Sequence, residues 1–228
     1  MTDTPRLYLY EEITLLALRD KKGTLSTCFA NMGVAGALMA ELLLEGRVAI
    51  DGTRKKLIEV RSRDLFGDPV LDEALRQIAA SSRRASLKSW IPRLANAKNL
   101  HHRVAQQLCR RGILRADEDS VLLIFRRKIY PELNPLPERE LIERMRNAIV
   151  SDSSQVDPRT MILLSLAKAA DLLATSVGRD VVKAGKARIK AIVQGEATGK
   201  ATREVIEATQ AAMIAATVVP TIVAGSHH

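Results

Sequence analysis

The dominant pattern along this chain is the recurrence of apolar residues every three or four positions, which is typical of helices that bury one face. Leu9, Ile13 and Leu16 form such a stripe in the first segment. The segment 26–44 differs because it is apolar on nearly all sides and rich in Gly and Ala, which predicts a buried helix that other helices approach closely. We expect helices over residues 7–19, 26–44, 71–82, 87–94, 97–111, 137–150, 160–176, 180–193 and 200–219.

Two stretches have the features of short β-hairpins, and each follows a long helix. The first joins residues 47–50 to 57–60 through Asp51-Gly52, a dipeptide that favours a tight turn. In the second, residues 113–115 and 121–125 are the expected strands. The polar residues Asp117, Glu118, Asp119 and Ser120 are expected to form its turn.

These elements predict a mainly α protein, a single globular helical domain with two short β-hairpins. The domain is expected to span residues 7–220. Residues 225–228, Gly-Ser-His-His, have the composition of a tag remnant and are left out of the fold.

Composition narrows the class of protein. Hydrophobic residues make up 46% of the chain but aromatic residues only 3%, so the core must be aliphatic. The 35 Lys and Arg against 26 Asp and Glu give a net charge of +9, which favours a polyanionic partner such as an anionic membrane or nucleic acid. Cys28 and Cys109 have no companions at metal-ligand spacing and are interpreted as buried thiols of a reducing compartment.

Motifs of catalysis are missing from the sequence, which contains no GxSxG, no HExxH and no Gly-rich phosphate loop. His101 and His102 lack the i,i+4 partners of a metal site. We therefore expect a protein that is not an enzyme and has no metal or cofactor. Neither a signal peptide nor an apolar run of about 20 residues is present, so any contact with a membrane is expected to be peripheral, from the cytoplasm.

The most informative segment is 98–128, which joins a cationic helix to a hairpin with a basic end. Leu100, Val104 and Leu108 form the buried stripe of the helix. The residues expected on its other side are Lys98, Asn99, His102, Arg103 and Arg110. The predicted strand Val121-Leu122-Leu123-Ile124-Phe125 is followed at once by Arg126, Arg127 and Lys128.

This combination suits a peripheral membrane protein, because cations bind phosphates and apolar residues enter the headgroup region. Each Lys or Arg near an anionic surface contributes about 1 kcal/mol, so four or five give weak, salt-sensitive attachment. The alternative is that these residues have only a structural role, in which the apolar strand packs on the core and the charged residues around it are exposed to solvent.

Several segments together resemble the Golgi phosphoprotein 3 family in their order and spacing. The similar segments are Leu9-Tyr10-Glu11-Glu12-Ile13 and 18–23, Ala40-Glu41-Leu42, Gly46-Arg47-Val48, 68–75, Ser89-Trp90-Ile91, 100–114, Asp157-Pro158-Arg159 and Ala170-Asp171-Leu172-Leu173. The resemblance implies a mostly helical fold that binds phosphatidylinositol 4-phosphate on a basic face beside a hydrophobic hairpin. In eukaryotic members it also implies coupling of Golgi membranes to partners that retain glycosyltransferases.

The resemblance places Lys98, His101 and Arg103 at the family's basic headgroup positions. It places the membrane-inserting or oligomer-forming hairpin on residues 117–126. The chain departs from the family pattern in the loop 24–32, which lacks the family's headgroup-contacting Trp, and at Ala35, where the family has an Arg. The similarity begins near residue 7, without the family's preceding arm, as expected of a bacterial or minimal member.

The expected headgroup site comprises Lys98, His101, His102, Arg103, Arg126 and Arg127, with Val121, Leu122, Leu123, Ile124 and Phe125 as the membrane or oligomer hairpin. The alternative is a winged-helix DNA-binding protein that uses the same cations. The apolar hairpin favours lipid, and neither helix before a hairpin has the Asn, Gln and Arg cluster of base recognition, so nucleic acid is not expected as a partner. A third interpretation, self-association through the hairpin, is compatible with lipid binding.

Overall fold

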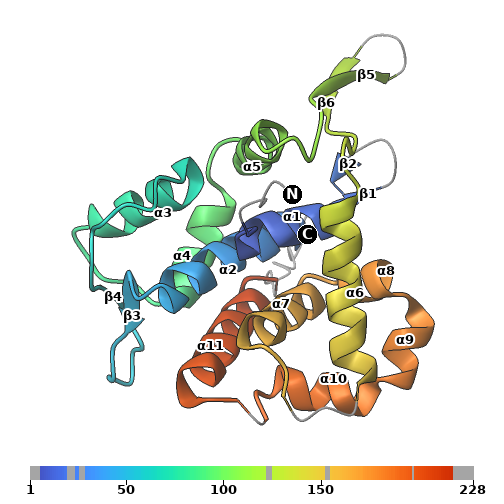
Figure 1. Ribbon diagram of the computed structural model, residues 1–228. Helices are drawn as coiled ribbons and strands as arrows, with labels where there is room; N and C mark the ends of the chain where they lie inside the picture. The colour runs from blue at the N-terminus through green and yellow to red at the C-terminus, as the bar shows by residue number, and fades with distance from the viewer. Residues whose placement is uncertain are drawn as a thin grey trace, which may run out of the picture.

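The computed structural model describes residues 6–19, 24–25, 29–121, 125–151, 155–196 and 198–217, and all structural statements refer to these residues. The helices are α1 (Leu9–Ala17), α2 (Phe29–Leu44), α3 (Pro69–Ala79), α4 (Leu87–Ala95), α5 (Leu100–Arg110), α6 (Leu136–Val150), α7 (Pro158–Ala169), α8 (Leu173–Val177), α9 (Arg179–Ala184), α10 (Lys186–Val193) and α11 (Lys200–Thr217). The strands are β1 (Leu18–Arg19), β2 (Thr24–Leu25), β3 (Val48–Ile50), β4 (Ile58–Val60), β5 (Asp117–Val121) and β6 (Phe125–Ile129). Consecutive strands pair as antiparallel hairpins β1–β2, β3–β4 and β5–β6. The predicted mainly α class is confirmed (Figure 1).

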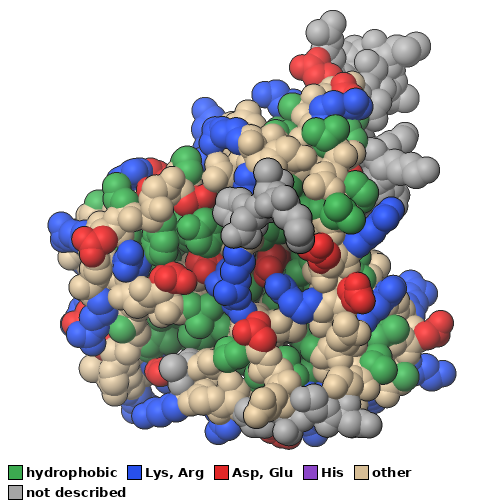
Figure 2. All heavy atoms as spheres, in the orientation of Figure 1, with side chains coloured by type: hydrophobic (Ala, Val, Ile, Leu, Met, Phe, Trp, Pro, Cys, Tyr) green, Lys and Arg blue, Asp and Glu red, His purple; other side chains and the backbone are tan. Residues whose placement is uncertain are grey.

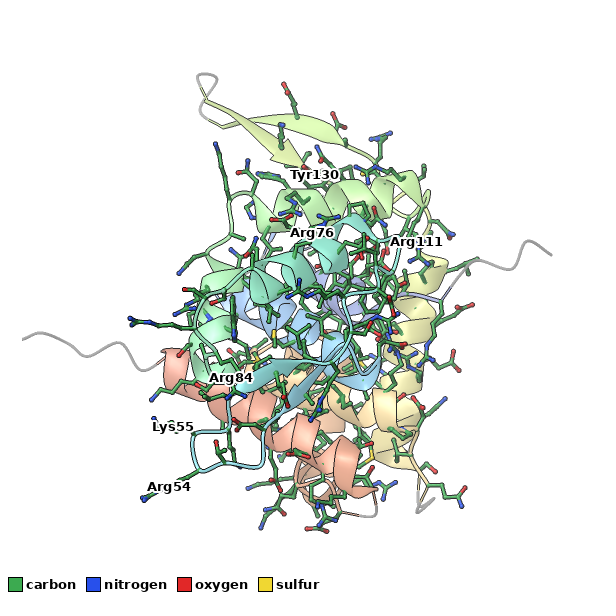
Figure 3. All side chains as sticks on the ribbon, turned by 90° about the vertical axis from the view of Figure 1, so that its left-hand side faces the viewer. Arg54, Lys55, Arg76, Arg84, Arg111 and Tyr130 are labelled. Carbon is green, nitrogen blue, oxygen red and sulfur yellow. The ribbon has the colours of Figure 1, made fainter. Side chains whose placement is uncertain are left out.

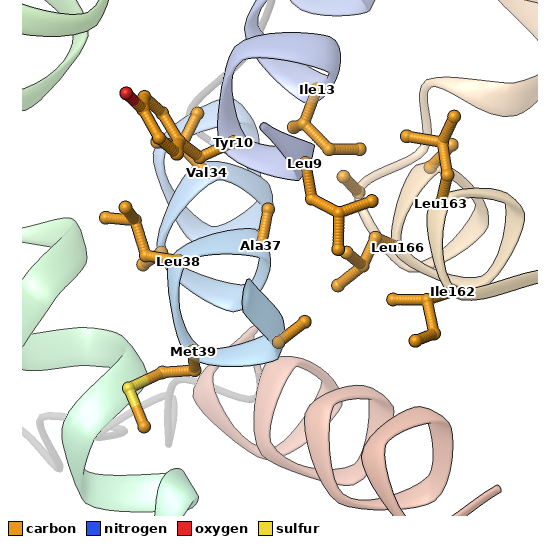
Figure 4. Close-up of a cluster of buried hydrophobic side chains, with 14 of the residues drawn as sticks. Leu9, Tyr10, Ile13, Val34, Ala37, Leu38, Met39, Ile162, Leu163 and Leu166 are labelled. Atoms are coloured by element: carbon orange, nitrogen blue, oxygen red, sulfur yellow. The ribbon is translucent and has the colours of Figure 1, made fainter. Parts of the chain in front are cut away.

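The core is built around α1, α2 and α7, with α4 and α11 packed against them (Figure 1). Leu9 and Ile13 of α1 and Leu163 and Leu166 of α7 belong to one apolar cluster with the middle of α2 (Figure 4). The small residues of α2 allow this close packing: a Cβ atom on Gly36 would lie 2.8 Å from Sδ of Met213 in α11. The predicted buried helix is thereby confirmed.

The second hairpin is shifted by four residues from its predicted position. Residues 117–121, predicted mainly as a turn, form β5, and residues 125–129 form its partner β6. The register places Glu118 opposite Lys128 and Asp119 opposite Arg127, so the pairing brings residues of opposite charge together. The predicted strand positions, 113–115 and 121–125, are therefore wrong. Residues 122–124 of the predicted strand lie outside the described residues.

Two predicted helices are each interrupted. The segment predicted over 160–176 is divided into α7 and α8 at Asp171, which has a φ of 58°. The N–H of Leu172 donates to the carbonyl of Ala167, and that of Asp171 donates to Lys168. These bonds satisfy the last carbonyls of α7 and stop the helix. The segment 180–193 is divided into α9 and α10 at Gly185, where α6 packs so closely that a Cβ atom would collide with Ile149.

Three ion pairs with buried carboxylates lie in and next to α1. Glu11 accepts a hydrogen bond from Arg111 at 2.5 Å, and Glu12 accepts one from Arg144 at 2.7 Å. A third carboxylate, Glu41 of α2, forms a two-atom pair with Arg159 of α7, at 2.5 and 2.7 Å. Glu41 also accepts the N–H of Leu9 at the first turn of α1. These charges therefore join α1 and α2 to α6, α7 and the residue that follows α5.

Substitution of Arg159 by Met should strongly destabilise the protein. The variant leaves the buried Glu41 side chain without its partner, and breaking a buried pair in this way costs about 3–5 kcal/mol. Arg76→Met provides the matched control, because Arg76 is an exposed residue paired with Glu73 and should cost about 0.5 kcal/mol or less. Urea denaturation of the two variants measures the difference, and equal losses would contradict a structural role for the buried pair.

Candidate functional site

The helix α5 is fixed on the core by the apolar stripe that the sequence predicts. Leu100, Val104 and Leu108 are all buried. At its middle, Gln107 donates a hydrogen bond of 2.9 Å to Asp68, the N-cap of α3. The same carboxylate accepts a 2.7 Å hydrogen bond from the Tyr10 hydroxyl of α1. These contacts hold α5 in a fixed position against the core, with its cationic side on the surface.

Four of the six predicted headgroup residues lie at the start of α5: Lys98 just before the helix, and His101, His102 and Arg103 in its first turn. Lys98 and Asn99 are exposed, and the chain enters the helix through Asn99 with a left-handed φ of 56°. His101 and His102 lie side by side and half-buried, with ring centroids 4.0 Å apart. Lys98, His101 and His102 thus lie together at the start of α5.

His102 connects α5 to the base of the β5–β6 hairpin. Its Nδ1 atom lies 2.9 Å from the hydroxyl of Tyr130, a buried residue directly after β6. Burial lowers the pKa of His102, and the positive charge of Lys128 on β6 lowers it further. Burial also lowers the pKa of His101, with an additional contribution from His102. Both imidazoles are therefore mainly uncharged at neutral pH, and the fixed positive charge of this region comes from Lys and Arg.

Arg103 acts electrostatically on α3. The hydrogen bond from Gln77 lowers the pKa of Glu73, and the charge of Arg103 lowers it further. Arg110, at the far end of α5, donates to Gln107 at 2.9 Å. The structure therefore divides the predicted cations of α5 between the hairpin side, with His102, and the α3 side, with Arg103.

The hairpin part of the predicted site is described only in its backbone. In the backbone register, Arg126 pairs with Ser120 and Arg127 with Asp119. Leu122, Leu123 and Ile124 lie outside the described residues, and the side chains of Val121, Phe125, Arg126 and Arg127 are not described. The strands themselves project beyond the helical body, next to α5 (Figure 1).

Sequence reasoning missed Tyr130 and the buried ion pairs. Tyr130 follows a basic strand, and nothing in its local pattern indicates a contact with a histidine 28 residues away. One of the ion pairs could have been suspected from the sequence, because Glu41 is the one charged residue in the largely apolar helix α2. A carboxylate in such a helix requires a buried cation.

The burial of α2 bears on the alternative of a winged-helix DNA-binding protein. The helix α2 is buried at nearly every described position, Ala35 included, so it cannot enter a DNA groove as the recognition helix of the β3–β4 hairpin. None of the described helices has both the length and the apolarity to cross a bilayer. Among the same residues, His, Cys, Asp and Glu side chains form no group that could hold a metal ion.

Residues 9–209 match the family model of Golgi phosphoprotein 3 (GPP34). The chain therefore belongs to the Golgi phosphoprotein 3 family, which confirms the resemblance found in its sequence. It is also similar to vacuolar protein sorting-associated protein 74 of Schizosaccharomyces pombe (strain 972 / ATCC 24843), with 28% identity over 176 residues. The match covers 67% of this chain and 51% of that protein, so the chain spans about half the length of this relative.

The two histidines of α5 should titrate below the ordinary pKa of about 6.5. NMR titration of the imidazole signals measures this, with His101→Gln and His102→Gln used to assign them. Because the unfolded chain takes up these protons at higher pH than the folded chain, stability should fall as the pH drops through about 6.5. A pKa at or above the ordinary value for both residues would contradict their half-buried, cation-facing placement.

Proposed function

We propose that this protein is a non-enzymatic peripheral membrane protein that binds the headgroups of anionic phospholipids of the phosphoinositide class. The headgroup site comprises Lys98, His101, His102, Arg103, Arg126 and Arg127. The observation that carries the proposal is the position of the β5–β6 hairpin, which projects from the body beside the cationic start of α5 (Figure 1). Phosphate-binding side chains and an apolar hairpin end can therefore meet one membrane together.

Net charge alone does not locate this site. Lys and Arg side chains are spread over the whole face of the molecule shown in Figure 2. What distinguishes α5 is its combination with the sequence Val121-Leu122-Leu123-Ile124-Phe125 at the end of the neighbouring hairpin. Insertion of such a segment adds an apolar contribution that salt does not screen, whereas the cations alone give salt-sensitive attachment.

The family and the relative support a role at intracellular membranes. The family is named for a Golgi phosphoprotein, and the relative for vacuolar protein sorting. On this basis the protein acts from the cytoplasm, on the cytoplasmic face of a membrane, which is the Golgi membrane if the source is eukaryotic. Phosphatidylinositol 4-phosphate is the first lipid to test.

The same hairpin offers a route to self-association. A two-stranded sheet has two outer edges with unpaired backbone groups, and β5–β6 is such a sheet. A second copy of the chain can pair with such an edge, and burial of residues 121–125 would stabilise the contact. Oligomers formed in this way should keep their mass in high salt, because apolar burial is not screened.

Liposome co-sedimentation tests the lipid site directly. Neutral, phosphatidylserine and phosphatidylinositol 4-phosphate vesicles are compared for the native protein and the Lys98→Ala/Arg103→Ala variant. At about 1 kcal/mol per cation, we expect a roughly 10- to 30-fold loss of binding to phosphoinositide vesicles. The matched control is Lys183→Ala/Lys186→Ala, which removes the same charge from exposed residues of α9 and α10.

The results separate three interpretations. Preference for the phosphoinositide, lost in the α5 variant and kept in the control, supports the proposed site. Equal losses in both variants would indicate non-selective attraction by net charge. Failure of the native protein to sediment with any vesicle would contradict the lipid-binding function.

Binding to phosphatidylserine vesicles should strengthen as the pH is lowered from about 7.5 to about 5.5. Acidification protonates His101 and His102, whose pKa values are lowered in the free protein, and the charged imidazoles attract the anionic surface. Phosphatidylserine is the suitable lipid because a phosphate monoester itself gains a proton near pH 6. A His101→Gln/His102→Gln variant should lose the pH dependence and keep its binding at neutral pH.

A further inference from the structure

A second cationic surface lies at the end of the molecule opposite the β5–β6 hairpin. The segment joining β3 to β4 carries Arg54, Lys55 and Lys56 in succession, and all three are exposed. In Figure 1 the β3–β4 hairpin points away from α5, and in Figure 3 Arg54 and Lys55 lie at the bottom while β5–β6 lies at the top. One flat membrane therefore cannot contact both surfaces at once.

The β3–β4 end is held in a defined conformation. The carboxylate of Asp51 accepts hydrogen bonds from the Thr53 hydroxyl at 2.7 Å and from the Leu57 N–H at 2.9 Å. Beyond it, the N–H of Ile58 donates to the carbonyl of Ala85 at 2.8 Å. The connection between α3 and α4 is thereby attached to the hairpin, and it brings two more exposed cations, Arg83 and Arg84.

Few acidic side chains of the described chain form ion pairs with these five cations. Within the described part of the chain, Arg84 has one acidic partner, Asp51, at the long distance of 3.8 Å. The other four have no carboxylate within ion-pair distance among the described residues. Elsewhere on the same side, Arg61 and Arg76 are paired with Glu59 and Glu73. The hairpin end and the α3–α4 connection therefore carry five exposed cations with a single, long ion pair among the described residues.

An apolar groove lies between the segment after β4 and the second half of α3, which leads into the α3–α4 connection. It has a volume of about 350 Å³ and is lined by Arg63, Leu65, Leu75, Arg76, Ala79 and Ala80. In Figure 3 its lining residue Arg76 lies above Arg84, which in turn lies above Arg54 and Lys55. Leu65 is 53% exposed, and Ala80 is followed three residues later by Arg83. The groove can accept an apolar side chain between two arginines.

We infer that this second surface docks an acidic segment of a partner protein, with an apolar side chain in the groove and carboxylates on the cations at positions 54–56 and 83–84. The observations favour a peptide over the other polyanions. Residues 51–56 contain no apolar side chain that could enter a membrane. Neither they nor residues 81–86 contain an aromatic ring for base stacking, as single-stranded nucleic acid would require.

Fluorescence anisotropy tests the inference on the full chain. The probe is a labelled synthetic peptide rich in Asp and Glu with one Leu near its start, and a peptide with Asn and Gln in place of the acids is its control. The hairpin variant carries Arg54→Gln, Lys55→Gln and Lys56→Gln. The matched control carries Lys183→Gln, Lys186→Gln and Lys190→Gln, which remove the same charge from exposed positions. A third variant, Leu65→Ser, tests the groove.

We expect roughly tenfold weaker binding of the acidic peptide by the hairpin variant, and little change for the matched control. Leu65→Ser should weaken binding about threefold or more, and should not change the salt dependence. Equal effects of the hairpin and control variants, or an unchanged affinity of the hairpin variant, would overturn the inference. Loss of vesicle sedimentation or of RNA binding in the hairpin variant, without loss of peptide binding, would also overturn it.

The result is independent of the proposed lipid site. The Lys98→Ala/Arg103→Ala variant should bind the acidic peptide like the native protein, and the hairpin variant should sediment with phosphoinositide vesicles like the native protein. Failure of one function therefore leaves the other intact and identifiable.

Discussion

The arrangement of this protein depends on charges buried beside α1. Adjacent carboxylates, Glu11 and Glu12, leave the helix in different directions and pair with Arg111 and Arg144. Burial raises the pKa of both glutamates, and the arginines oppose that shift. A buried carboxylate that loses its cation is costly, so only an arrangement that satisfies every pair is stable. The apolar core supplies most of the burial, and the ion pairs select which faces of the helices meet.

This constraint reaches the candidate site through α5. Arg111 directly follows the helix and ties its end to Glu11. Gln107, further along α5, donates a hydrogen bond to Asp68, and His102 in the first turn lies at hydrogen-bond distance from Tyr130, which follows β6. The cationic face of α5 and the direction of the β5–β6 hairpin are consequently set by the same network that orders the core. A flat membrane requires such a fixed relation between its polar and apolar contacts.

The local sequence pattern was sufficient to predict where most helices lie. It was not sufficient to predict where they are interrupted or which residues pair between them. The buried stripe of α5 follows directly from its spacing, because Leu100, Val104 and Leu108 are four residues apart. The hairpin register could not be found in the same way, because it is decided by pairs such as Glu118 and Lys128 across the strands. The buried ion pairs join residues 100, 132 and 118 positions apart, and no local period indicates such partners. For the site, the sequence could identify cations and an apolar run, while the neutral histidines and the contact with Tyr130 required the fold.

The two cationic surfaces suit different ligands, because different residues lie next to the cations at each end of the molecule. Beside α5, the cations adjoin the β5–β6 hairpin, whose sequence includes the apolar run 121–125, and two histidines whose charge depends on pH. This combination suits a membrane surface, where phosphates lie above hydrocarbon. At the β3–β4 end, the cations lie on a hydrogen-bonded turn without apolar residues, and an apolar groove of about 350 Å³ lies along α3. A partner bound there would approach from the side away from the proposed membrane contact (Figure 3). The separation of the two surfaces therefore allows a membrane and a protein segment to be bound at the same time, without competition for the same charges.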